Sequence, residues 1–113
     1  MTKGILVVLS EPADGKEQDY NDWYDKTHGP EIIALDGFTA YSRYKMAPTQ
    51  PGSNEGMPGY CAVYEIDSDD LMGTVAGIGA AVAAGKVQMA DVIKRDPAPT
   101  MILYEEITAR TEA

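Results

Sequence analysis

The chain has 113 residues, with nine Lys and Arg against eighteen Asp and Glu, giving a formal net charge of −9. The length fits one domain spanning residues 1–113, and the acidic balance argues against nucleic acid or an anionic membrane as a partner. A single cysteine, Cys61, cannot form an internal disulfide, and no apolar run reaches the roughly 20 residues of a membrane span, so a cytoplasmic protein is expected.

Apolar periodicity and turn residues predict elements in the order β-α-β-β-α-β. The expected elements are a strand at 3–10, a helix from 14 to 27 or 28, a short helical piece at 31–35, strands at 38–46 and 60–66, a helix at 69–85 and a strand at 101–107. Residues 47–58, rich in Pro and Gly, form a long loop that is either a lid or disordered.

Capping patterns set the expected helix boundaries. Asp14 with Glu17 is a plausible start for the first helix, and Ser68 for the second. Gly29-Pro30 is expected to interrupt the first helix, with Pro30 in the first turn of the short piece. That piece is expected to stop at Asp36-Gly37, where Gly can adopt a left-handed conformation.

The element order is that of the ferredoxin-like α+β fold, with a four-stranded antiparallel sheet and two main helices. Two helices cover only one face of such a sheet. Apolar residues nevertheless occupy both faces of the first strand, with Ile5 and Val7 opposite Leu6 and Val8. Either a second copy covers the other face in a twofold homodimer, or the face is simply mixed in character.

The segment before Gly29 carries the functional signal. At about 100° per residue, one arc of the predicted helix holds Tyr20, Trp23, Tyr24, Thr27 and His28. The only histidine therefore lies on an aromatic face, where an imidazole can move a proton on an organic substrate near neutral pH. Alternatively, it caps the end of the helix, and Trp23 and Tyr24 are core anchors.

Two strings carry a family resemblance. They are Trp23-Tyr24-Asp25-Lys26-Thr27-His28-Gly29-Pro30-Glu31, ending in Asp36-Gly37-Phe38, and Tyr41-Ser42-Arg43-Tyr44. They resemble the dimeric α/β-barrel superfamily and, within it, the EthD-like group. Asp36-Gly37 stands where Pro-Gly is common. The resemblance covers the first 45 residues well and the remainder by element order.

The resemblance implies a homodimeric barrel whose pocket binds a small hydrophobic or aromatic molecule. It also implies cofactor-independent acid/base chemistry of the cyclase, dehydratase or isomerase type. The alternatives are a non-catalytic or stress-responsive binding barrel and a cofactor-free monooxygenase. The candidate site residues are His28 as acid or base, Tyr24 as oxyanion donor, Trp23 and Tyr20 as apolar wall, and Asn21 and Arg43 as substrate contacts.

No cofactor and no metal is expected. One His and one Cys make a transition-metal site improbable on composition, and Asp19, Asp22 and Asp25 fit a solvated helix face better than a calcium site. Arg43 has two interpretations: it either binds a carboxylate or enolate oxygen of the substrate, or it pairs with a carboxylate of the chain.

Overall fold

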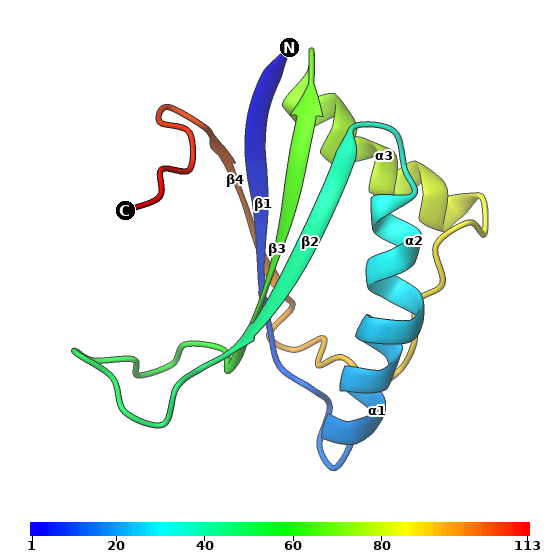
Figure 1. Cartoon of the computed structure of the whole chain (residues 1–113). Helices are drawn as coiled ribbons and strands as arrows, with labels where there is room; N and C mark the ends of the chain where they lie inside the picture. The colour runs from blue at the N-terminus through cyan, green and yellow to red at the C-terminus, as the bar shows by residue number, and fades with distance from the viewer.

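The computed structural model describes residues 1–113 and confirms the predicted β-α-β-β-α-β order. Its elements are β1 (Thr2–Ser10), α1 (Glu17–Trp23), the π-helical turn η1 (Tyr24–His28), α2 (Gly29–Ile33), β2 (Phe38–Lys45), β3 (Tyr60–Ser68), α3 (Leu71–Ala83) and β4 (Thr100–Glu105). The strands form one antiparallel sheet in the order β2-β3-β1-β4, which is the ferredoxin-like arrangement. All helices lie on one face of the sheet (Figure 1).

Alternation along the central strands separates the two faces. On β1, Leu6 and Val8 are buried against the helices, whereas Ile5 and Val7 point to the opposite face and are half-buried. On β3, Tyr64 pairs in register with Leu6 and is also buried. The core therefore lies between the helices and one face of the sheet.

The first helical region is continuous, so the predicted interruption at Gly29-Pro30 is wrong. The π-turn η1 carries the chain across it, with the Gly29 N–H donating to the carbonyl of Tyr24 five residues earlier. Pro30 then falls in the first turn of α2, directly after the π-turn. A Cβ atom on Gly29 would overlap the ring of Tyr41, so glycine allows β2 to approach this closely.

Helix starts also differ from the sequence expectation. The first helix begins at Glu17, with Lys16 at the N-cap position, and not at Asp14. In α3 the cap is Asp70, whose carboxylate accepts from the Gly73 N–H at 2.9 Å, and not Ser68. At the stop after α2, Gly37 has φ of +91°, as its left-handed role requires.

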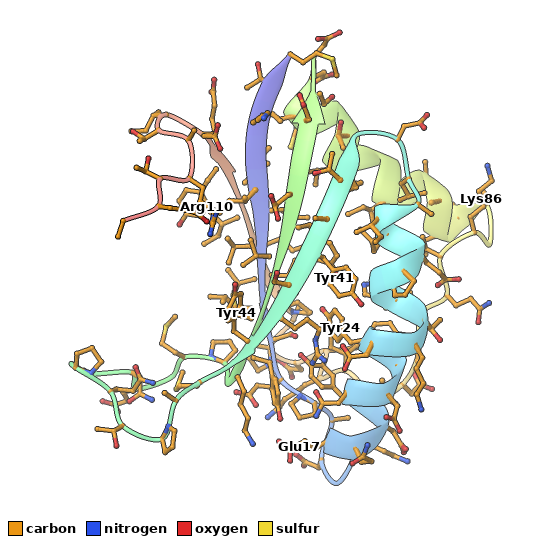
Figure 2. The ribbon with its side chains drawn as sticks, in the orientation of Figure 1. Glu17, Tyr24, Tyr41, Tyr44, Lys86 and Arg110 are labelled. Carbon is orange, nitrogen blue, oxygen red and sulfur yellow. The ribbon has the colours of Figure 1, made fainter.

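No helix covers the other face of the sheet, which we call the open face (Figure 1). The loop between β2 and β3 extends away from the helices. Tyr44 and Tyr104 on that face are 58% and 51% exposed. Figure 2 shows Tyr44 on the side of the sheet away from the helices, whereas Tyr24 and Tyr41 lie between the sheet and the helices. None of the helices combines the length and apolar character needed to cross a bilayer.

Candidate functional site

A cavity of about 320 Å³ lies between the helices and the sheet, and His28 is part of its wall. We call it the His28 cavity. Its fourteen lining residues are Leu6, Val8, Trp23, Tyr24, His28, Ile32, Tyr64, Ile78, Gly79, Val82, Met89, Ile93, Pro99 and Met101. None of these is Asp, Glu, Lys or Arg, and eleven are hydrophobic. A cavity of this size and character suits a small, uncharged organic molecule.

The helix continues through the π-turn, and this turn carries His28, whose side chain lies in the cavity wall. The Nδ1 atom is buried and has no hydrogen-bond partner, and the chain continues as α2 beyond the ring. The interpretation of His28 as a cap at a helix end is therefore wrong. A buried imidazole nitrogen without a partner in the chain costs free energy of folding, which makes this ring a candidate for binding a ligand or taking part in a reaction.

Burial controls the charge of this imidazole. It lowers the pKa of His28 from 6.5 to about 4, and the negative charge of nearby Glu31 offsets only part of the shift. At neutral pH the ring is therefore uncharged, with one nitrogen free to accept a proton and the other carrying one. The whole lining of the His28 cavity is then neutral.

Two aromatic rings fix the orientation of the imidazole. The Trp23 ring stacks on it with centroids 4.3 Å apart and planes at 19°, and the Tyr24 ring meets it edge-on at 5.2 Å and 84°. The Trp23 indole N–H donates to the carbonyl of Gln88 at 3.3 Å, which ties the helix to the segment after α3. Trp23 and Tyr24 thus both line the cavity and anchor the core.

Tyr64 of β3 is a cavity residue that sequence reasoning missed. Its side chain is 2% exposed, and its hydroxyl is buried. Burial, followed by the neighbouring Tyr24 phenol, raises its pKa far above the ordinary value, so it stays protonated. The alternation of buried residues along β3 indicates only that Tyr64 is buried. No local sequence pattern indicates that it lines the same cavity as His28.

The other sequence-predicted residues lie outside the cavity lining. Tyr20 is buried in the core, where its hydroxyl pairs with that of Ser10 at 2.6 Å. Asn21 and Arg43 line a separate groove of about 590 Å³ between α1 and β2. The structure thus brings His28, Tyr24 and Trp23 together at the cavity, whereas Tyr20, Asn21 and Arg43 are not part of its lining.

Arg43 makes its polar contacts within the chain and packs against Tyr24. Its guanidinium donates to Asp25 Oδ1 at 2.9 Å and to Asn21 Oδ1 at 2.8 Å. Its side chain is 13% exposed, and its Cζ lies 4.6 Å from the centre of the Tyr24 ring. Of the two interpretations of Arg43 from sequence, the structure shows pairing with a carboxylate of the chain, although on a helix and not on a neighbouring strand.

Comparison with known proteins supports the fold. No family model and no curated protein matches this chain. Among solved structures, it is similar to an EthD-like protein from Ralstonia eutropha JMP134, with 19% identity, a TM-score of 0.60 and coverage of 98% of this chain and 97% of the other. It is also similar to a protein of unknown function from Nitrosomonas europaea, with 20% identity, a TM-score of 0.58 and coverage of 100% and 97%.

Both structures match nearly the whole chain, and the first is an EthD-like protein, so the similarity to EthD-like proteins predicted from sequence is confirmed at the level of the fold. Fold similarity does not identify a reaction, because one fold supports many chemistries. What this protein does must be argued from the His28 cavity itself.

Proposed function

We propose that this protein catalyses cofactor-independent proton transfer on a small, uncharged, apolar or aromatic molecule bound in the His28 cavity. One observation carries the proposal: the only histidine presents a neutral imidazole, with an unpartnered nitrogen, in the wall of a cavity that contains no charged residue. The imidazole is the acid or base, and cyclisation, dehydration and isomerisation are the reaction types that such a group supports.

The first step is removal of a proton from a carbon next to a carbonyl group. The C–H bond breaks, its electron pair moves toward the carbonyl oxygen to form an enolate, and the proton binds a ring nitrogen of His28. The Tyr24 phenol, whose pKa burial raises to about 12, remains protonated and is the candidate donor to the enolate oxygen. Return of the proton to a different atom completes an isomerisation without an added reagent.

A lowered pKa is compatible with this role. A free imidazole with a pKa of about 4 is a weak base, but it is fully available to accept a proton at neutral pH. Once the proton has moved, the imidazolium and the enolate lie side by side in a cavity lined mostly by hydrophobic residues. Their mutual attraction is stronger there than in bulk solvent, and it favours the charged pair.

Exchange of hydrogen for deuterium in 1-indanone tests the proposal without a known substrate. In D2O, the wild-type protein is expected to accelerate exchange of the protons next to the carbonyl, followed by proton NMR. The His28→Gln variant should lower the protein-catalysed rate by at least about 100-fold. Lys26→Gln is the matched control, because Lys26 lies on the same helical turn with its side chain 76% exposed.

Equal rates for wild type and His28→Gln would overturn the acid/base proposal, as would the absence of any exchange. If 1-indanone quenches the fluorescence of Trp23 but does not exchange, a non-catalytic binding protein is favoured instead. Trp23 is the only tryptophan and lines the cavity, so its emission reports occupancy directly.

We further propose that the protein is a homodimer joined through the open face of the sheet. The helices leave that face uncovered (Figure 1), and it carries Ile5, Val7, Ile102 and Tyr104, which pair across β1 and β4. Ile102 and Tyr104 are 38% and 51% exposed in the single chain. A second copy is the simplest cover for such an apolar surface. Sedimentation should give a dimer, and Ile102→Glu should give a monomer.

A further inference from the structure

Negative charge on a ligand in the His28 cavity has only one possible cation in the cavity wall, the His28 imidazolium that proton transfer itself creates. The fourteen lining residues include no Lys or Arg, and His28 is uncharged until it accepts a proton. A permanent positive charge directly behind a lining residue would add to this stabilisation.

Arg43 is such a group, because its guanidinium packs against the ring of the lining residue Tyr24. Its guanidinium lies 4.6 Å from the centre of the Tyr24 ring, and the edge-on contact between Tyr24 and His28 joins the ring to the proposed base. The rings of Tyr20 and Tyr60 are also near the guanidinium, at 5.5 and 5.9 Å. A cation against aromatic faces with little exposure to water exerts a stronger field than one in solvent.

We infer that Arg43 is a positioning residue, which holds the Tyr24 ring in place from behind and supplies the positive field that stabilises negative charge on a ligand in the His28 cavity. The inference rests on the proposed function, because it assumes that a ligand acquires such charge. It assigns Arg43 a role without contact with the ligand, which differs from the substrate contact expected from sequence.

Two further observations support the assignment. The positive charge of Arg43 acts on both phenols of the cavity wall: it opposes the larger effect of burial on the pKa of Tyr24 and of Tyr64. Hydrogen bonds to Asp25 and Asn21, both from the helical region, fix the guanidinium in position. The Asp25 carboxylate is 60% exposed, so solvent screens its charge more strongly than that of Arg43, at 13%.

The experiment uses 4-nitrophenol, whose phenol and phenolate forms absorb at different wavelengths. Bound to wild-type protein, its ionisation midpoint is measured by absorbance against pH, with binding followed by quenching of Trp23. Arg43→Met keeps a long apolar stem but removes the charge. It should raise the midpoint of the bound probe by about 0.5 to 1 pH unit, a three- to tenfold loss of phenolate at a given pH.

Two conservative variants separate charge from structure. Arg43→Lys retains the charge and should restore most of the wild-type midpoint, even if the Tyr24 ring is held less firmly. Arg43→Gln removes the charge but keeps an amide N–H that can donate to Asp25 or Asn21, so it should raise the midpoint as Arg43→Met does. If Arg43→Met fails to fold, the comparison of Arg43→Gln with Arg43→Lys decides.

An unchanged or lowered midpoint in a folded variant without the charge, Arg43→Met or Arg43→Gln, overturns the inference alone, as does an equally raised midpoint in Arg43→Lys. A probe that does not bind overturns both the inference and the use of the cavity as a ligand site. Failure of 1-indanone exchange with normal binding of 4-nitrophenol contradicts the proposed reaction but leaves this titration interpretable.

Discussion

The two regions next to Tyr24, the His28 cavity and the groove around Arg43, differ in the respects that matter for chemistry. In the first, His28 has a buried nitrogen without a hydrogen-bond partner, and the lining is free of charged residues. In the second, which we call the outer groove, Arg43 is fully engaged with Asp25 and Asn21 among other charged side chains. Although the outer groove is larger, its charges are already paired. The difference teaches that unmet bonding capacity, and not the size of a hollow, marks the candidate site.

Removing the Tyr24 ring should have the largest effect on stability. Tyr24 is 1% exposed and contacts His28, Trp23 and Arg43, so Tyr24→Ala leaves an unfilled space among these three residues. We expect a loss of about 3–5 kcal/mol in the free energy of unfolding, measured with urea. Tyr24→Phe keeps the ring and should lose less than about 1.5 kcal/mol. Equal losses of unfolding free energy in the two variants would contradict the expected contribution of the Tyr24 ring to stability.

The pH dependence of stability tests the burial of the His28 imidazole. Because the pKa of His28 is about 4 in the folded protein and 6.5 in the unfolded chain, the unfolded chain binds more protons between these values. The stability is therefore complete above pH 6.5 and falls as the pH is lowered toward 4, by up to about 3 kcal/mol. His28→Gln should remove this part of the pH dependence. Curves that stay parallel from pH 7 to pH 4 would show that the ring is not buried as described.

Filling the cavity should have the smallest effect on the fold and a clear effect on binding. Gly79 lines the His28 cavity, and a Cβ there meets no atom within 4 Å. Gly79→Leu should weaken binding of 1-indanone at least about tenfold while stabilising α3 by roughly 0.5–1 kcal/mol. Gly77→Leu is the matched control, since Gly77 is equally unobstructed but lines a different groove. Identical indanone affinities in the two variants would place the binding site elsewhere.

The sequence was sufficient to predict the fold and to single out His28, which the structure places in the wall of a cavity. Strand alternation and the spacing of Trp23, Tyr24 and His28 are local patterns, and they predicted the element order and the aromatic helix face. The predicted break at Gly29-Pro30 failed because a π-turn, which has no clear sequence signal, carries the helix across it.

The rest of the site depends on contacts between segments distant in the chain. Arg43 meets Asp25 across 18 residues, and Tyr64 lies across the sheet–helix interface from His28. The segment after α3, including Met89 and Ile93, has no periodic pattern, yet it helps to close the cavity. Only tertiary packing decides whether such residues leave a void or fill it.

The central claim is that the single histidine is held uncharged, facing a cavity without charged residues. Proton NMR of the imidazole as a function of pH tests it directly, because this chain contributes only one histidine signal. The account predicts a titration midpoint near 4 that moves when 1-indanone binds. A midpoint between about 6 and 7 that is indifferent to 1-indanone would place the ring in solvent and contradict the account.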